Sequence, residues 1–319
     1  MVMMKQIALI LPYFGKLPNY FGLFLQSCSH NPQADFFIFT DAEIETSPPN
    51  VKITNISFSG FVKIIQSKFD FLVNIKSPYK LCDFKPAYGY IFEELIANYP
   101  YWGYCDCDLI FGNLNLLKPY IEEGHDRIGV WAHLMIYKNT KEVNRWFINL
   151  HNDLVPTFEE IAKDSRCRFF DEYMGMDILV GKNNKDWCKE WLFDDIIFYC
   201  QNFYSKRKFN NCELSHKTPI YFKYQEGRLI RYIYIDNHWK TDESLYVHLQ
   251  KRKMSVETND IDNYYIIPNR FVGLDYEEKK RLKSAQPPFI DYTYHKLMIK
   301  AKIKRFINLL KSKGLCNIY

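Results

Sequence analysis

The stretch from Trp102 to Gly112, WGYCDCDLIFG, decides the fold class of this chain. It is an apolar run interrupted by two acids, Asp106 and Asp108, and its pattern predicts a buried strand. Carboxylates are costly to bury in such a strand unless a counter-charge neutralises them. At spacing i, i+2 on an extended backbone, both side chains leave the same face and can approach one divalent cation. Oxygen ligands favour Mg²⁺ or Mn²⁺, which in turn bind a diphosphate. The alternative is a strand end that turns to solvent with both acids hydrated.

Upstream of this stretch, short apolar runs predict buried strands at residues 7–11, 36–40 and 51–56. Between the first two runs, residues 20–28 carry apolar side chains on one helical face. From Pro86, apolar residues at positions 88, 91, 92 and 95 predict a further helix, which ends near Pro100. Buried strands that alternate with helices predict an α/β sheet.

Downstream, the pattern predicts strands at residues 127–131, 133–137 and 228–235. A helix is expected over residues 143–150, capped by Asn139 or Thr140. Residues 205–217 are basic and rich in Asn, which predicts a surface loop.

The bulk composition is that of a globular protein, with 47% hydrophobic and 25% charged residues. Nine Cys are present, and the Cys105-x-Cys107 pair matches none of the usual zinc spacings. The first ten residues lack the features of a signal peptide, and no apolar stretch reaches the roughly 18 residues of a membrane-spanning helix. We therefore expect a cytoplasmic protein with free thiols.

The net charge of +5 is concentrated at the C-terminus. Residues 277–319 hold eleven Lys or Arg and three acids, a net of +8, so the rest of the chain carries −3. Within this region, residues 294–313 predict a basic amphipathic helix suited to an anionic membrane surface, such as the inner face of the plasma membrane. The alternative is a terminal helix packed on the body. An acidic body without a recognised motif argues against nucleic-acid binding.

The order of these segments resembles the GT-A fold of glycosyltransferases. The resemblance rests on the segment from Tyr79 to Gly89, an amphipathic helix, and the Asp106-x-Asp108 strand, in that order. It extends to the family 8 galactosyl- and glucosyltransferases, and more closely to an uncharacterised bacterial group from capsule and O-antigen gene clusters. It covers roughly residues 5 to 255.

This resemblance implies a GT-A-like (Rossmann-like) α/β single domain with a mixed central sheet. The domain would span residues 1–255, with a nucleotide-sugar half at 1–115 and an acceptor half at 116–255. A basic, partly helical tail would follow at 256–319. The implied activity is transfer of a hexose from a UDP-sugar, with Mn²⁺ or Mg²⁺, to a saccharide or lipid-linked saccharide acceptor in bacterial surface polysaccharide synthesis.

The resemblance also implies donor-binding residues. Tyr13 follows the first strand, where the nucleotide base would lie, and Asp41 ends the second strand, where base or ribose would bind. Thr40-x-x-Glu43 also fits a capping box, so both interpretations of Asp41 stay open. Asp83 could bind donor-sugar hydroxyls or stabilise a helix start. Lys85 could contact the diphosphate or be a solvated surface group.

Late in the chain, His248 would complete the metal ligands with Asp106 and Asp108, because many GT-A enzymes use a late His in this way. The neighbouring Lys251 and Arg252 would hold the leaving diphosphate. A lone His is otherwise more often structural or solvated than a ligand.

A second acidic cluster, Phe170 to Asp177, lies where a GT-A enzyme faces its acceptor. Glu172 or Asp177 could act as general base toward the acceptor hydroxyl. The alternative is a solvated loop with an aspartate that caps a helix.

Two other functions fit the same features. A sugar nucleotidyltransferase also needs paired acids and a metal, but its usual Gly-rich basic loop is missing after the first strand, where Leu11 to Tyr20 holds one Gly and one Lys. A non-catalytic, membrane-associated saccharide-binding protein would tolerate loss of the carboxylates.

Overall fold

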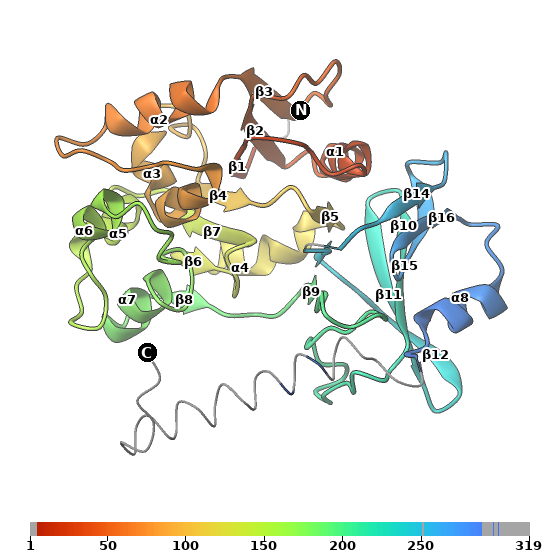
Figure 1. Cartoon of the computed structure of the whole chain (residues 1–319). Coiled ribbons are helices and arrows are strands. Elements are labelled where there is room, and N and C mark those ends of the chain that lie inside the picture. Colours follow the sequence, from red (N-terminus) through yellow and green to blue (C-terminus); the bar gives the residue numbers. More distant parts are fainter. Residues whose placement is uncertain (1–4, 251, 289–295, 297–298, 300–319) are drawn as a thin grey trace. The chain divides into compact units, whose positions relative to one another are not determined.

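The computed structural model describes residues 5–250 and 252–288, together with Lys296 and Ile299. Contacts within the chain divide it into two compact units, Met1–Leu192 and Phe193–Tyr319, called here the first and the second unit. Figure 1 shows the elements of each unit. A division by contacts does not assign a nucleotide half or an acceptor half, so those halves stay a prediction.

The first unit is built on a seven-stranded mixed sheet in the order β3-β2-β1-β4-β7-β6-β8. β1 pairs in parallel with β2 and β4, and β2 pairs in parallel with β3, whereas β7 runs antiparallel to both β4 and β6. The strands are β1 (Ile7–Tyr13), β2 (Ala34–Thr40), β3 (Val51–Asn55), β4 (Tyr101–Cys105), β6 (Arg127–Ile128), β7 (Leu134–Lys138) and β8 (Trp187–Cys188). The predicted α/β class with a mixed central sheet is confirmed.

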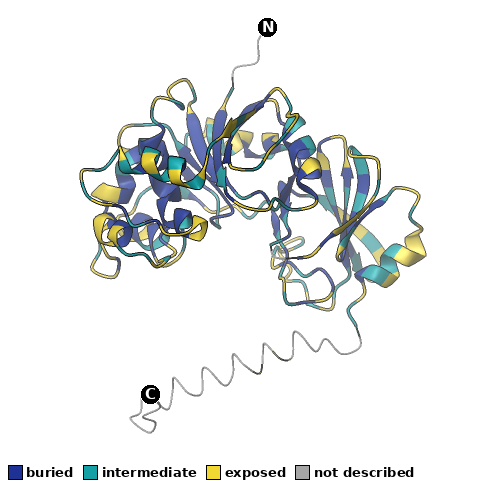
Figure 2. Ribbon diagram, turned by 45° about the horizontal axis from the view of Figure 1, so that its top comes forward, coloured by how far each residue is buried: buried dark blue, intermediate teal, exposed yellow. Residues whose placement is uncertain are grey.

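Helices and short strands cover this sheet. They are α1 (Phe21–Ser29), α2 (Phe58–Gln66), η1 (Pro78–Ala87), α3 (Tyr88–Ile91), β5 (Leu109–Phe111), η2 (Leu114–Leu117), α4 (Lys118–Glu122), η3 (Val143–Arg145), α5 (Trp146–Asn149), α6 (Phe158–Lys163) and α7 (Met176–Lys182). Figure 2 shows that buried residues concentrate along the central strands. Because side chains alternate along a strand, β2 sends Phe36 toward Phe111 and Phe39 toward Phe61 and Phe92, so both faces of the sheet are packed.

Most predicted elements of the first unit are confirmed. The three early strands and the helix at residues 20–28 are β1, β2, β3 and α1. The helix predicted at residues 143–150 is divided into η3 and α5. The hydroxyl of Thr140 accepts a hydrogen bond from the backbone N–H of Val143, but the N-cap residue of η3 is Glu142, whose side chain makes no cap bond. The predicted helix after Pro86 is much shorter than expected: a 3₁₀ segment, η1, runs up to Ala87, and α3 covers only four residues.

One prediction about the deciding stretch is wrong. The acids do not lie within a continuous strand, because Asp106, Cys107 and Asp108 form a bend between β4 and β5. Cys107 is 4% exposed, whereas both aspartates are half-buried. The apolar flanks pair as strands, and the bend keeps the charged groups out of the buried ladder.

The second unit contains a six-stranded sheet in the order β12-β11-β10-β15-β16-β14, antiparallel except for the β14–β16 pair. The strands are β10 (Ile220–Gln225), β11 (Arg228–Ile235), β12 (His238–Glu243), β14 (Ser255–Glu257), β15 (Asn263–Ile267) and β16 (Arg270–Gly273). β9 (Asp194–Asp195) pairs in parallel with β13 (Tyr246–His248), and α8 (Glu278–Ala285) contacts β10 and β15. Positive φ at both residues of the two-residue turns Glu226-Gly227 and Asp236-Asn237 suits tight hairpins.

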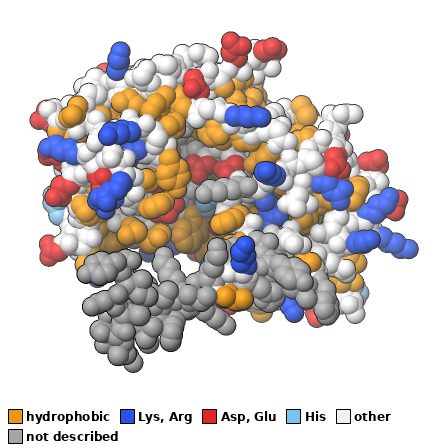
Figure 3. Space-filling view, viewed as in Figure 1, with side chains coloured by type: hydrophobic (Ala, Val, Ile, Leu, Met, Phe, Trp, Pro, Cys, Tyr) orange, Lys and Arg blue, Asp and Glu red, His pale blue; other side chains and the backbone are white. Residues whose placement is uncertain are grey.

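The strand predicted at residues 228–235 is confirmed as β11, and the loop predicted at 205–217 contains only isolated bridges. The described part of the predicted tail, residues 256–288, contains most of β14, then β15 and β16, besides α8. The amphipathic helix predicted at 294–313 lies outside the described residues, apart from Lys296 and Ile299. Among the helices that the structure describes, none has the length and apolar character to cross a membrane. On the face shown in Figure 3, hydrophobic, basic and acidic side chains are interspersed.

Candidate functional site

The carboxyl ends of β1, β2 and β4 define the candidate site. β1 lies between β2 and β4, and the chain passes from β1 to β2 and β3 on one side before it returns as β4 on the other. This reversal is a topological switch point, and open α/β sheets bind ligands in the crevice beyond the strand ends there. The residues that follow these ends are Phe14 after β1, Asp41 after β2 and Asp106 after β4.

The loop after β1 is held by the residue after β2. The backbone N–H of Gly15 donates a hydrogen bond of 3.0 Å to Oδ1 of Asp41. Gly15 has φ +109°, a conformation in which a side chain would be strained. Asp41 therefore positions the loop that follows Tyr13, whatever else it binds. No helix follows Thr40 in residues 41–50, and its hydroxyl accepts from the N–H of Ala42, so the capping-box interpretation is wrong.

Tyr13 connects this loop to the bend that carries the acids. Burial raises the pKa of the Tyr13 phenol, and electrostatic interactions with the neighbouring side chains of Cys107 and Asp108 raise it further. Burial likewise raises the pKa of Tyr20, again with a contribution from Asp108. The loop after β1 and the acidic bend after β4 therefore lie within electrostatic reach of each other, as a single site requires.

The bend presents oxygen ligands rather than sulfur ligands. The N–H of Asp106 donates to the carbonyl of His133 at 3.0 Å, which holds the bend against the start of β7. Burial raises the pKa of both the Cys105 and the Cys107 thiols, which disfavours their thiolate forms. Two half-buried carboxylates remain, and this ligand set fits a hard cation such as Mn²⁺ or Mg²⁺.

Lys85 is the cation of the site. Its Nζ lies 2.8 Å from Oδ1 of Asp106 and 3.5 Å from Oδ2 of Asp171, and it donates to the carbonyl of Ala132 at 3.0 Å. Its side chain is 11% exposed. Burial alone would lower the pKa of Lys85, but Asp106 and Asp171 outweigh it and hold that pKa well above the usual value. The ammonium therefore stays charged, and the surface-lysine interpretation is wrong.

Asp171 also belongs to the site, although the sequence pattern did not single it out. This carboxylate is 2% exposed, and its Oδ1 accepts no hydrogen bond from the residues that the structure describes. Burial raises the pKa of Asp171 well above its ordinary value, against the opposing effect of Lys85. Its place next to Glu172 in an acidic cluster was the only available signal, and spacing alone did not separate the two.

Asp83 has a structural position. It is fully buried, and its carboxylate accepts from Nζ of Lys80 at 2.7 Å and from the N–H groups of Arg168 and Phe170 at 2.9 Å. The side chain thus joins η1 to the segment before Asp171. This burial argues against donor binding and favours the alternative of a structural role.

The two predicted general bases differ in environment. Oδ1 of Asp177 accepts from the guanidinium of Arg127 at 2.7 Å, and Arg127 is fully buried with its guanidinium 4.1 Å from the Trp187 ring. A carboxylate that neutralises a buried cation has a structural task. Glu172 is half-buried at the start of a turn, where its carbonyl accepts from the N–H of Gly175.

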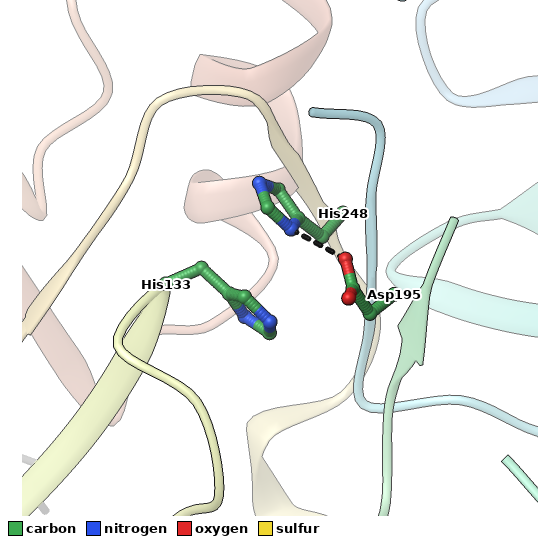
Figure 4. Close-up of side chains that lie close together, drawn as sticks. All are labelled: His133, Asp195 and His248. Atoms are coloured by element: carbon green, nitrogen blue, oxygen red, sulfur yellow. Dashed lines mark hydrogen bonds and ion pairs between the residues drawn. The ribbon is translucent and has the colours of Figure 1, made fainter. Parts of the chain in front are cut away.

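In the second unit, His248 is oriented by a carboxylate. Its Nδ1 lies 2.8 Å from Oδ1 of Asp195, as Figure 4 shows, and Gln250 donates to the same oxygen at 2.6 Å. A carboxylate that accepts from one ring nitrogen favours the tautomer in which the other nitrogen can bind a metal. Metal ligation by His248 itself stays a prediction.

Lys251 and Arg252 were both predicted to contact the diphosphate, and the structure describes only Arg252. Lys251 lies outside the described residues. Arg252 is 9% exposed, and its guanidinium donates to the carbonyls of Ile197, Cys200, Gln201 and Asn202 and to Oδ1 of Asn269. These bonds argue against a diphosphate role, because the guanidinium holds a loop of its own unit.

Comparisons with known proteins give a family without an assigned function. A family model described as "Family of unknown function (DUF6625)" matches residues 9–275. No curated protein sequence matches. Among solved structures, the galactosyltransferase LgtC in complex with donor and acceptor sugar analogues is 13% identical, with a TM-score of 0.32 over 59% of this chain and 75% of that chain. The apo-form glycosyltransferase GlyE of Streptococcus pneumoniae TIGR4 is 10% identical, with a TM-score of 0.29 over 58% of this chain and 45% of that chain.

Proposed function

The chain belongs to this family of unknown function, and we propose that it is a metal-dependent glycosyltransferase that moves a hexose from a UDP-sugar to a saccharide acceptor. The observation that carries the proposal is the bend Asp106-Cys107-Asp108 at the switch point of the sheet, next to the buried ammonium of Lys85. Such a crevice suits a nucleotide, and paired carboxylates suit the cation that a diphosphate requires.

In this proposal, different residues of the first unit bind different parts of the donor. Asp106 and Asp108 would hold Mn²⁺ or Mg²⁺, which neutralises charge on the departing nucleoside diphosphate. Lys85 supplies a second fixed positive charge beside Asp106. Tyr13 would line the crevice beside the nucleotide, and Asp41 fixes the loop that follows Tyr13.

Residues outside this group complete the proposal. His248 serves as the third metal ligand and Lys251 as a further contact to the diphosphate, as the sequence resemblance implies. Glu172 is the proposed general base toward the acceptor, since Asp177 neutralises Arg127. Residues 1–115 then form the donor half, and residues 116–255 the acceptor half.

The acceptor and the cellular setting follow from the resemblance alone. We propose a lipid-linked saccharide in bacterial capsule or O-antigen synthesis as the acceptor. The basic segment 294–313 would bind the anionic inner face of the plasma membrane in an otherwise cytoplasmic protein.

Calorimetry of UDP binding tests the donor site directly. UDP is titrated with and without Mn²⁺ into the unaltered chain, Asp108→Ala and the control Asp153→Ala, which removes an exposed acid elsewhere in the first unit. We expect binding only with Mn²⁺, loss of binding in Asp108→Ala and no change in the control. UDP binding that ignores both the metal and Asp108 would overturn the proposal.

Product analysis separates this function from its rivals. A glycosyltransferase incubated with UDP-sugars and Mn²⁺ slowly releases UDP and free sugar when water replaces the acceptor. A nucleotidyltransferase given pyrophosphate instead forms UTP and a sugar 1-phosphate. A saccharide-binding protein forms neither set of products.

A further inference from the structure

Two adjoining cavities of the second unit are lined by none of the residues assigned above to the donor. Each has a volume of about 410 Å³, and they share Gln201 and Asn269 as lining residues. Phe198, Tyr199 and Lys253 line the first cavity, whereas Arg270 and Lys283 line the second. We refer to them together as the Gln201 cavities. Volumes of this size hold one or two sugar rings.

Arg252 holds several of the residues that line the cavities. Its guanidinium donates to four backbone carbonyls of residues 197–202, lies over the Phe203 ring at 5.2 Å and donates to Asn269 at 2.9 Å. Asn269 itself lies in the turn between β15 and β16 with φ +67°. One buried side chain thus joins a long loop to a sheet turn, so the cavities are formed before any ligand arrives.

The charge of the lining has one sign. Four of its side chains are cations, namely Arg252, Lys253, Arg270 and Lys283, and no acid lines either cavity among the residues that the structure describes. Arg270 forms an ion pair of 3.5 Å with Glu257, which lies outside the lining. Such a concave surface attracts an anion.

An exposed aromatic side chain lines the first cavity. Phe198 is 52% exposed, and its ring packs edge-on against Tyr199 at 5.5 Å. Ring faces bind the C–H faces of sugars, and polar groups around them fix orientation. A ring beside cations suits a sugar that carries a negative group better than it suits a free inorganic anion.

We propose that the Gln201 cavities bind an anionic group of the saccharide acceptor, a phosphate or a sugar carboxylate, with the adjacent sugar ring against Phe198. The proposal rests on the glycosyltransferase function proposed above and adds to it the chemical class of the acceptor. Lys253 and Lys283 supply the accessible charges, because both are exposed whereas Arg252 is bound within the protein.

Saturation-transfer NMR on the full chain tests the proposal with three probes, glucose 1-phosphate, glucuronic acid and neutral glucose. We expect at least one of the two anionic probes to bind, and we expect glucose to bind at least tenfold more weakly than that probe. The double variant Lys253→Glu, Lys283→Glu should weaken the anionic probe tenfold or more, and Phe198→Ala should weaken it severalfold. Lys240→Glu, which reverses an exposed charge on β12 of the same unit, should change nothing.

Three results would overturn the inference: equal binding of glucose and the anions, an unchanged anion affinity in the double variant, or loss in Lys240→Glu as well. Co-sedimentation with phosphatidylglycerol vesicles, compared with phosphatidylcholine vesicles, addresses a lipid surface. Loss of vesicle binding in the double variant with saccharide binding intact would also overturn it. UDP binding, measured in parallel, tests the donor site separately. If UDP binds but the anionic probes do not, only the proposed acceptor site is refuted. If the anionic probes bind but UDP does not, only the proposed transferase function is refuted.

Discussion

Nζ of Lys85 lies 2.8 Å from Oδ1 of Asp106, and this ion pair joins a buried cation to a carboxylate whose side chain is 37% exposed. On its buried side the same ammonium lies 3.5 Å from Asp171. Lys85 therefore neutralises a buried charge and also sets the position of a proposed metal ligand. We therefore expect a substitution of Lys85 to affect both the stability of the first unit and the binding of the donor.

Replacement of Lys85 by Met is expected to lower the free energy of unfolding by about 3 kcal/mol, because Asp171 loses the cation that compensates its burial. The double variant Lys85→Met, Asp171→Asn should recover part of this loss, because the uncompensated charge is gone. Urea denaturation measures both. Lys118→Met, at a side chain that is 67% exposed, is the control and should change stability by less than about 0.5 kcal/mol. A double variant no more stable than Lys85→Met would show that the two residues act independently.

Asp41→Ala is expected to weaken UDP binding about tenfold, because the N–H of Gly15 loses its acceptor and the loop of Tyr13 loses its anchor. Asp41→Asn retains an oxygen that can accept this bond and should restore most of the affinity. Calorimetry with Mn²⁺ compares the three proteins. Equal losses in the Ala and Asn variants would instead assign Asp41 a role through its charge.

Asp194→Asn is expected to destabilise the second unit by about 3 to 5 kcal/mol. Asp194 and Arg231 are fully buried and pair at 2.9 Å, and Arg207 pairs with the other carboxylate oxygen at 2.9 Å. The substitution leaves these guanidinium groups short of negative charge. Thermal or urea denaturation measures the change, with Glu213→Gln, an exposed acid, as the control. A loss below 1 kcal/mol would mean that Asp242, 2.6 Å from Arg231, compensates alone.

The stability of the first unit is expected to depend on pH through His125. Its ring nitrogens lie 3.0 Å from Asp186 and 3.1 Å from Glu123, and hydrogen bonding to Asp186 is the largest of the effects that raise the pKa of His125. A raised folded-state pKa contributes stability that is fully present below the unfolded value of about 6.5 and is lost as pH rises through the folded value. Urea denaturation at pH 6 and pH 8 should show a loss of up to about 1 kcal/mol that His125→Gln lacks. An equal pH response in both proteins would contradict this assignment.

The sequence by itself determined the class of the fold and the centre of the candidate site. Continuous apolar runs at β1 and β2 predict strands buried on both faces, and a pair of acids in such surroundings predicts a compensating partner. These are local properties, because an apolar run and the i, i+2 spacing of Asp106 and Asp108 can both be recognised within a short stretch of the sequence. The α/β class and its mixed central sheet were accordingly predicted correctly.

Only the tertiary structure decided what each polar side chain contacts. Lys85 meets Asp106 across 21 residues, Asp83 meets the N–H of Phe170 across 87, and Arg252 meets the carbonyl of Ile197 across 55. Nothing in local spacing distinguishes Asp83, which is fully buried, from Asp106, which is half-exposed, or Asp171 from Glu172. Burial and pairing arise when distant segments pack, and the cost of an uncompensated charge then selects the contacts that form.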